Sequence, residues 1–376
     1  MSLVDAWIQE EFGWCDLGDA RLEWRLQQIV KDLAAKPSAS LPQACEDAAA
    51  LKATYRFLDN PALRAPDLLL SHQRANLPRL RPHPVVLAVQ DTTFLDFTAH
   101  PETQGLGPLA TPHSLGLCSH NTLAFTPERL PLGLLHQQVW VREESTYANQ
   151  EDPKTRPIDQ KESQKWLLSL EALNEMAPLC PQTLLVSVGD READIYDLLL
   201  SERAQNVHLL LRAAQDRCLQ PSGRLKSSIK ATPISATLVV NLPRRDKQAA
   251  RQAHLSVRFA TLTLRPPKHR ASEALPPVSV GVILVREEHP PAGCAPITWL
   301  LLTTLPLARV EQALEYVQYY CVRWQIEIWH KVLKSGCRIE ALQLGHADRL
   351  ERCLALYSVI AWRLLYATTK ARPGSF

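Results

Sequence analysis

The chain has 376 residues, of which 46% are hydrophobic and 22% charged, and its net charge is +3. This composition is that of a globular protein, and the length allows two or three domains. No apolar run approaches the roughly 20 residues that cross a bilayer, the N-terminus lacks a secretory pattern, and the nine cysteines include no CxxC pair. A membrane protein, a disulfide framework and a zinc site are therefore disfavoured, and a cytoplasmic location is expected.

Residues 1 to about 75 are predicted to be helical. "LGDARLEWRLQQIVKDLAAK" has a helical apolar period, and "CEDAAALKATYRFLDNP" repeats it before the pattern stops at Asn60-Pro61. "HPVVLAVQDTT" then predicts a buried strand that ends at Asp91. Two further strands are expected in "LAFTPERLPLGLLHQQVWVREE", and a helix is expected in "KESQKWLLSLEALNEM".

The second half of the chain alternates strands with helices and contains an insertion. "QTLLVSVGD" predicts a buried strand ending at Asp190, followed by a helix in "READIYDLLLSERAQ" and a strand in "VHLLLR". From about 213 to 296, prolines and basic residues punctuate runs such as "ISATLVVNLP", which indicates a β-rich insertion. A strand in "ITWLLLTTLP", a long helix from about Leu307 and a last helix in "ADRLERCLALYSVIAWRLLYATT" follow. The order of elements indicates an α/β core.

Positive charge is concentrated between residues 205 and 270. This segment contains 13 Lys and Arg residues and two acidic residues, a local net charge of +11. A block of this density is typical of a surface that binds polyanions, and a solvated charged face is the alternative. Nucleic acid is the favoured partner.

The stretch "YCVRWQIEIWHKVLK", residues 320–334, has two distinct sides if it forms one helix. At about 100° per residue, one narrow face collects a tyrosine, two cations and a carboxylate, and the opposite face is apolar. The first face consists of Tyr320, Arg323, Glu327 and Lys334, and the apolar face of Val322, Ile326, Trp329 and Leu333. An ordinary solvated helix face is the alternative to a site for chemistry.

Three carboxylates could form a metal site. Asp91 and Asp190 each follow a predicted strand, where functional groups gather in open α/β sheets, although an aspartate there is also a common turn or N-cap residue. With Glu327 they could hold two Mg²⁺ ions, which prefer oxygen ligands and serve phosphodiester chemistry. A competing interpretation takes Glu327 and His330 as the Glu-x-x-His pair of a di-iron bundle, but the sequence offers no second such pair.

These residues resemble the IS-four family of DDE transposases. The family signature Tyr-x2-Arg-x3-Glu-x6-Lys is matched by Tyr320, Arg323, Glu327 and Lys334. The segments "QDTT", "GDREADIY", "KESQKW" and "WLLLTTLP" resemble other family segments, and "LGDARLEWRL…ATYRFLDNP" resembles the N-terminal DNA-binding region. The resemblance implies an RNase H-like α/β core with a β-rich insertion, preceded by a small helical N-terminal domain. The expected domains are 1–75 for binding DNA ends, 76–212 for the first part of the catalytic core, 213–296 for the insertion and 297–376 for the second part of the core.

The resemblance also implies a role for each site residue. Asp91, Asp190 and Glu327 would be the catalytic triad and would hold two Mg²⁺ ions, for which Mn²⁺ could substitute. Trp299 would stack on a base flipped out of the duplex, with Trp324 as a second aromatic near it, although Trp299 opens an apolar strand and core packing is the alternative. The residues expected to contact DNA are Tyr320, Arg323, Lys331, Lys334, Arg212, Trp299, Trp324, Arg21 and Arg25.

The activity implied is cut-and-paste DNA transposition through strand nicking, hairpin formation and opening, and strand transfer. The expected partners are double-stranded DNA, as transposon ends and target, and a second copy of the chain in a homodimer at the bacterial nucleoid. Two features depart from the family. Thr237 stands where a family member has an aromatic residue in the insertion, and the sequence stops at "KARPGSF", where that member continues into a region that pairs subunits. A truncated DNA-binding repressor of transposition is therefore the alternative function.

Overall fold

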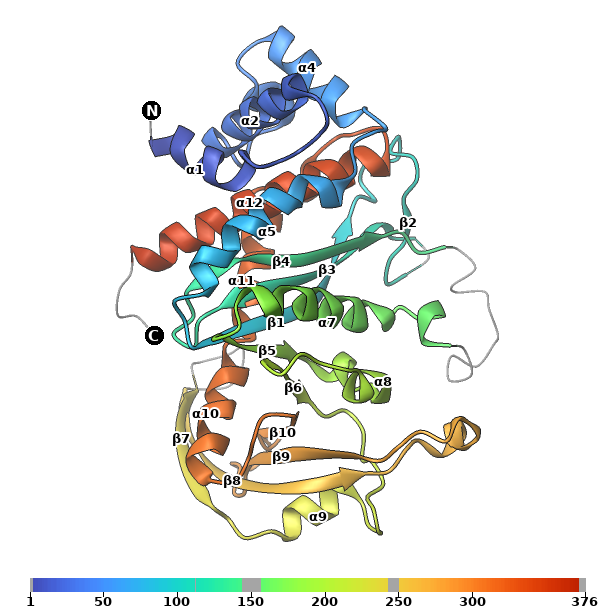
Figure 1. Cartoon of the computed structure of the whole chain (residues 1–376), viewed down its shortest axis with the longest axis vertical. Coiled ribbons are helices and arrows are strands. Elements are labelled where there is room, and N and C mark those ends of the chain that lie inside the picture. The colour runs from blue at the N-terminus through green and yellow to red at the C-terminus, as the bar shows by residue number, and fades with distance from the viewer. Residues whose placement is uncertain (1–2, 112, 144–156, 243–249, 372–376) are drawn as a thin grey trace. The chain divides into compact units, whose positions relative to one another are not determined.

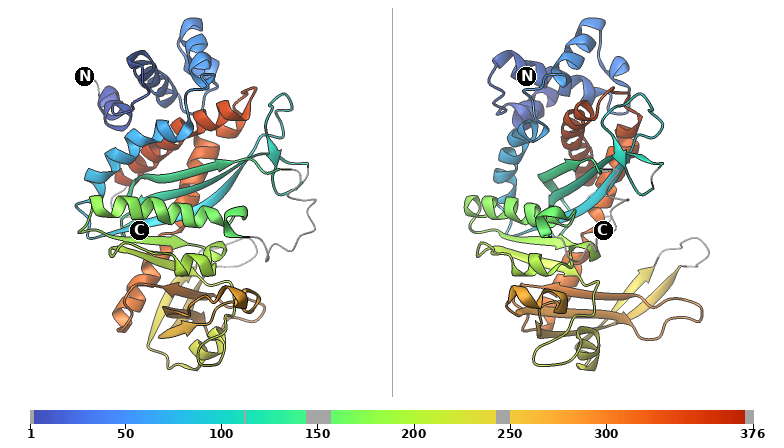
Figure 2. Two further views of the ribbon diagram at one scale, coloured as in Figure 1. Left: turned by 45° about the vertical axis from the view of Figure 1, so that its right-hand side comes forward. Right: turned by 90° about the vertical axis from the view of Figure 1, so that its right-hand side faces the viewer.

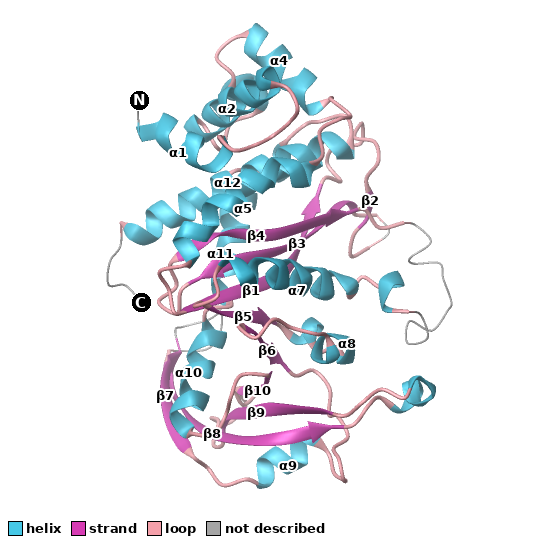
Figure 3. Ribbon diagram, in the orientation of Figure 1, coloured by secondary structure: helices cyan, strands magenta, loops and turns pink. Residues whose placement is uncertain are grey.

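The computed structural model describes residues 3–111, 113–143, 157–242 and 250–371. The chain folds into two compact units. The first consists of Met1–Glu151, Glu175–Thr183 and Trp324–Phe376, and the second of Asp152–Asn174 and Leu184–Arg323. Figure 3 distinguishes their helices and strands.

The first unit begins with helices, as the sequence predicts. Four of them precede residue 60: α1 (Leu3–Phe12), α2 (Ala20–Ala35), α3 (Leu41–Ala44) and α4 (Ala48–Leu58). Asp19 caps α2 by accepting a hydrogen bond from the Arg21 amide, and Asp47 caps α4 through the Ala50 amide. The buried stripe of α2 follows helical spacing, with Leu26, Ile29, Val30 and Leu33.

Two long helices, α5 (Ala65–Leu80) and α12 (Ala347–Lys370), pack on each other and on the sheet of the first unit (Figure 1). The strands of this sheet are β1 (Val85–Asp96), β2 (Gly107–Pro108), β3 (Leu115–Phe125) and β4 (Pro131–Trp140). β3 pairs antiparallel with each of the other three. A short 3-10 turn, η2 (Ala177–Leu179), also belongs to this unit.

The prediction that the first strand ends at Asp91 is wrong. β1 continues to Asp96, and its ladder with β3 runs without interruption from Leu87 to Asp96. Asp91 lies inside this ladder, opposite Asn121. The strand continues because backbone pairing with β3 extends it beyond its apolar part.

The second unit contains a mixed sheet. Its strand order is β5 (Leu184–Gly189), β6 (Val207–Arg212), β10 (Thr298–Thr303), β9 (Val278–Glu287), β8 (Arg251–Leu264) and β7 (Ala236–Leu242). β5 and β6 are parallel, and all other neighbours are antiparallel. The helices and helical turns are η1 (Ile158–Gln160), α7 (Gln164–Met176, its last two residues in the first unit), η3 (Arg191–Ala193), α8 (Tyr196–Leu200), α9 (Leu225–Ala231), η4 (Lys268–Glu273) and α10 (Val310–Cys321).

The predicted β-rich character of the insertion is confirmed by β7, β8 and β9. β8 and β9 form a long hairpin with η4 at its tip, as both views of Figure 2 show, and α9 packs against these two strands. The helix expected in 191–205 is shorter than predicted, because only η3 and the five residues of α8 are helical there.

The long helix expected through residue 334 is broken. α10 ends at Cys321, and α11 (Trp324–Lys331) starts after a turn in which the Val322 amide bonds to the Tyr319 and Tyr320 carbonyls. A π-helical turn, η5 (Val332–Gly336), and η6 (Ile339–Ala341) follow. The predicted single face is therefore wrong, since Tyr320 and Glu327 lie on different helices. The predicted apolar side is confirmed, with Val322, Ile326, Trp329 and Leu333 all buried.

Among the described helices, none has both the length and the apolar character that a membrane crossing requires.

Candidate active site and nucleic-acid interface

Glu327 is carried by a helix that is firmly packed in the first unit. Its neighbours Ile326 and Trp329 are fully buried, and the Trp329 indole donates a hydrogen bond of 3.3 Å to the Ser358 carbonyl on α12. α11 also packs against β1, the strand that contains Asp91. Both carboxylates are half-buried. Two of the three predicted triad residues therefore lie on elements that contact each other.

A buried polar network attaches α11 to the sheet. The Asn121 amide nitrogen lies 3.3 Å from His330 Nε2, and Gln137 Nε2 donates to both Asn121 Oδ1 (2.7 Å) and Ser358 Oγ (2.8 Å). His330 is thus a contact between α11 and β3. Sequence reasoning missed Asn121 and Gln137, and the signal that could have found them is polar side chains inside otherwise apolar strands.

The outer face of α11 carries Trp324, Ile328 and Lys331, all exposed. With Glu327 they follow the spacing of three and four residues that places side chains on one side of a helix. The predicted DNA contacts Trp324 and Lys331 are therefore accessible on the same face as Glu327.

Lys334, the last residue of the signature, is engaged within the first unit. Its ammonium lies 3.1 Å from the Glu340 carboxylate and donates to the Phe94 carbonyl, and Glu340 also accepts a 3.0 Å hydrogen bond from the Asp96 amide. Lys334 therefore connects η5 to the end of β1.

Asp190 lies in the second unit, directly after β5. Its carboxylate accepts a 2.8 Å hydrogen bond from the Glu192 amide and caps η3. The alternative of an N-cap is confirmed for this residue. The cap fixes the carboxylate at the end of the strand, and it leaves other lone pairs on the carboxylate.

A buried ion pair holds the other end of η3. The Asp194 carboxylate accepts hydrogen bonds from the Ala214 and Gln215 amides (2.8 and 2.9 Å) and from the Arg217 guanidinium (2.6 Å). Asp194 and Arg217 are both buried. This pair fastens the turn that begins at Asp190 to the segment that follows β6, and sequence reasoning did not identify it.

Tyr320, Trp299 and Arg212 come together in the second unit. The Trp299 and Tyr320 rings meet edge to face, with centroids 5.7 Å apart, and the Arg212 guanidinium donates to the Thr298 carbonyl (3.2 Å). The Tyr320 hydroxyl is buried, and the Arg212 guanidinium lies close to it. Burial raises the pKa of this hydroxyl, and the nearby charges of Arg323 and Arg212 oppose the rise.

The carboxylates of the predicted triad are divided between the units, Asp91 and Glu327 in the first and Asp190 in the second. Among the described residues, three or more His, Cys, Asp or Glu side chains are nowhere grouped as the ligands of a metal ion would be.

The family model for the transposase DDE domain matches residues 155–362, more than half of the chain. The chain belongs to the DDE transposase family. A second family model, for transposase DNA binding, matches residues 4–63 of this transposase. Its α/β fold with a mixed sheet is an RNase H-like core. A solved structure that is similar to it is the cryo-EM structure of a piggyBac transposase synaptic complex with hairpin DNA, with a TM-score of 0.43, 9% sequence identity, and coverage of 98% of this chain and 74% of the other.

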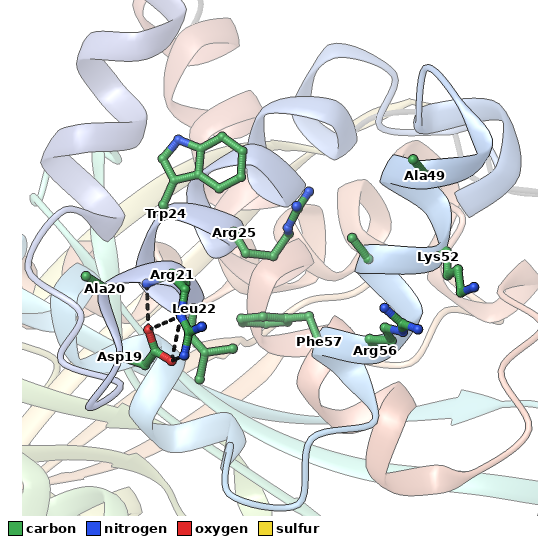
Figure 4. Close-up of a pocket in the computed structure, with 11 residues that line it drawn as sticks. Asp19, Ala20, Arg21, Leu22, Trp24, Arg25, Ala49, Lys52, Arg56 and Phe57 are labelled. Atoms are coloured by element: carbon green, nitrogen blue, oxygen red, sulfur yellow. Dashed lines mark hydrogen bonds and ion pairs between the residues drawn. The ribbon is translucent and has the colours of Figure 1, made fainter.

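The DNA-binding region of the transposase contains a groove between α2 and α4, with a volume of about 820 Å³ (Figure 4), here called the α2–α4 groove. The predicted residues Arg21 and Arg25 line it, and Lys52 and Arg56 of α4 do so as well. Arg21 is paired with Asp19 at 2.8 Å, yet its side chain remains 91% exposed. Sequence reasoning missed the two cations of α4, although their spacing of four residues places them on one helix face.

Part of the positive charge between 205 and 270 is neutralised inside the transposase. Four of the arginines form ion pairs with carboxylates that lie outside this segment: Arg217 with Asp194, Arg251 with Glu287, Arg258 with Glu288, and Arg270 with Asp197 and Glu273. Three further cations, Arg244, Arg245 and Lys247, fall outside the described residues. The local charge count of the sequence therefore overstates the charge that this segment presents to a polyanion.

Proposed function

We propose that this transposase belongs to the IS-four family and catalyses cut-and-paste transposition of an insertion sequence. The observation that carries the proposal is the packing of α11, which lies in the segment matched by the DDE family model, on β1. These two elements hold Glu327 of the signature and Asp91. The reaction would nick one strand at the element's end, form and open a hairpin, and join the free 3′ ends to target DNA. Each step is an in-line phosphoryl transfer.

Asp91, Asp190 and Glu327 are the proposed metal ligands. Their carboxylates are hard oxygen donors, which suit Mg²⁺ and also Mn²⁺. Asp91 and Glu327 stand on contacting elements, and the cap of η3 fixes Asp190. When bound, two such ions would activate the attacking oxygen and stabilise the leaving oxygen.

Other side chains would hold the DNA during these steps. Arg323 and Arg212 would bind phosphates near the cleavage point, with Tyr320 beside them. Trp299 and Trp324 would stack on a flipped base. Two copies of the chain would pair the two transposon ends, in the bacterial cytoplasm.

Replacing Glu327 with Gln tests the proposal. Gln has nearly the same shape, so α11 keeps its packing, but a charged metal ligand is lost. DNA from the flanks of the coding region, carrying its inverted repeats, is the substrate. We expect binding within about twofold of wild type, and Mg²⁺-dependent nicking and hairpin formation reduced at least about a hundredfold. An electrophoretic shift measures binding, and a denaturing gel of end-labelled DNA separates nicked, hairpin and fully cut products.

Glu311→Gln is the matched control, because Glu311 is an exposed carboxylate in the first turn of α10. This variant should cleave at the wild-type rate. Nicking that persists at full rate in pure Glu327→Gln protein would falsify the assignment of the triad. Absence of any hairpin in the wild-type reaction would overturn the proposed cut-and-paste route.

A further inference from the structure

Trp24 is an exposed aromatic residue beside the α2–α4 groove. Its side chain is 56% exposed, although burial of a large apolar side chain typically stabilises a protein by roughly 1.5–3 kcal/mol. The Arg25 guanidinium lies 4.9 Å from the indole ring centroid, a cation–π contact that holds the two side chains together. In Figure 4, Trp24 stands at the edge of the groove and Arg25 points into it.

The groove has the shape and charge of a surface for DNA. Its α2 wall presents Arg21, Trp24 and Arg25 at helical spacing, and its α4 wall presents Lys52 and Arg56. Two alanines of α4, Ala49 and Ala53, also line the groove, and their small side chains leave space beside the cations. Four cations and one acid, Asp19, line the groove, a net charge of +3. This excess attracts the phosphates of a polyanion regardless of its sequence.

We propose that Trp24 makes the apolar, sequence-dependent contact between this groove and transposon-end DNA. The inference rests on the proposed function, which supplies the DNA. An indole is uncharged and has a single N–H donor, so it gains little from a phosphate. A helix fits the major groove of DNA, where the thymine methyl group is the apolar feature of the base edges. The cations of the groove position the duplex, and Trp24 contacts a base edge of this kind.

Trp24→Ala and Trp14→Ala form a matched pair of variants. Trp14 is 71% exposed, follows α1 and does not line the groove. Fluorescence anisotropy measures affinity for end DNA and for a scrambled duplex of the same composition, over a series of salt concentrations. We expect Trp24→Ala to weaken binding of end DNA about tenfold or more, with a much smaller effect on scrambled DNA and an unchanged salt slope. Trp24→Phe should recover part of the affinity, and Trp14→Ala should match wild type.

Arg56→Ala separates this contact from the electrostatic one. It should weaken binding of both duplexes alike and reduce the salt slope by roughly one. Uracil lacks the methyl group of thymine, so thymines of the end DNA are replaced by uracil one position at a time. At the position that Trp24 contacts, the replacement should weaken binding by the wild type and should not weaken binding by Trp24→Ala any further.

Equal weakening of both duplexes by Trp24→Ala, or none, overturns the inference. Wild-type cleavage of the same end DNA is measured in parallel. If cleavage is normal and only the Trp24 result fails, the role of Trp24 is wrong and the proposed function stands. If the wild type neither binds nor cleaves end DNA in preference to scrambled DNA, both fail.

Discussion

Lys331 and Lys334 carry the same charge on adjacent turns, but their surroundings differ. Lys331 is exposed on the outer face of α11, whereas Lys334 is held by Glu340 and the Phe94 carbonyl. Lys334 is a residue of the signature expected to contact DNA, so Lys334→Ala should lower DNA affinity and reduce the salt slope by roughly one. It should also reduce the free energy of unfolding by about 1 kcal/mol or less, as expected for a partly exposed pair.

Anisotropy over a salt series and urea unfolding measure these two effects. Lys331→Ala should change the salt slope alone. Lys370→Ala, at an exposed position in the last turn of α12, should leave the salt slope unchanged. An unchanged salt slope for Lys334→Ala removes this residue from the phosphate contacts and leaves it a purely structural role.

Residues that belong to a motif with distinctive spacing could be identified from the sequence. The residues that contact them in the folded protein could not. The signature spacing points to Glu327, but nothing in the sequence says that Asn121 approaches His330 more than 200 positions away. The ion pair of Asp194 with Arg217 is equally invisible. Such contacts depend on which strands become neighbours, and that is decided by packing of the whole unit.

At the scale of elements, the docking of α1 on α5 depends on a buried polar network. Glu11 of α1 accepts hydrogen bonds from His72 Nδ1 (2.5 Å) and from the Arg79 guanidinium (2.6 Å). The Leu134 amide of β4 donates to His72 Nε2 (2.9 Å), so the imidazole is neutral, with its proton on Nδ1. Burial lowers the pKa of His72, against the opposing charge of Glu11. Burial alone would raise the pKa of Glu11, but the hydrogen bonds from His72 and Arg79 lower it overall.

Both shifts predict loss of stability in acid. In the unfolded chain His72 takes up a proton as the pH falls through about 6.5, while the folded state keeps it neutral, so protons favour unfolding. The depressed pKa of Glu11 adds a further loss as the pH falls below about 4.3. Between pH 7 and 5, this single site should lower the free energy of unfolding by up to about 1.4 kcal/mol for each pH unit below 6.5.

His72→Gln tests this expectation, because a glutamine amide can donate to Glu11 and accept from Leu134 without titrating. Urea unfolding at several pH values should show a shallower decline from pH 7 to 5 than in the wild type. His254→Gln, at an exposed position of β8, should keep the wild-type decline. An identical pH dependence for His72→Gln would show that another group controls the acid sensitivity.

Most elements could be predicted from apolar periodicity, and the exceptions have physical causes. β1 passes through Asp91 because pairing with β3 continues to Asp96, a long-range effect absent from a local pattern. The break between α10 and α11 occurs at Val322 and Arg323, without the proline or glycine that usually marks such a break. The net charge counted over 205–270 overstates the charge of its surface, because the carboxylates that pair with several of its arginines lie elsewhere in the chain.

At the scale of the whole molecule, the signature itself is divided. Tyr320 and Arg323 belong to the second unit, and Glu327 and Lys334 to the first. A local motif therefore includes residues of both compact units, and the carboxylates of the proposed triad are assigned to both units as well. We further propose that each active site of the proposed homodimer cuts the end that the partner copy holds.

Mixing two inactive variants tests this sharing. Glu327→Gln should bind ends without cutting them, and the double variant Arg25→Ala/Arg56→Ala should retain its carboxylates but bind ends poorly. In a mixed dimer, the first copy holds an end and the second supplies an intact triad. We expect the mixture to cut end-labelled DNA to about a quarter to a half of the wild-type extent, since random pairing of equal amounts makes about half of the dimers mixed. Each variant alone should be close to inactive. If the mixture is as inactive as its components, while a mixture of either variant with wild type still cuts, each copy cleaves the end that it binds itself.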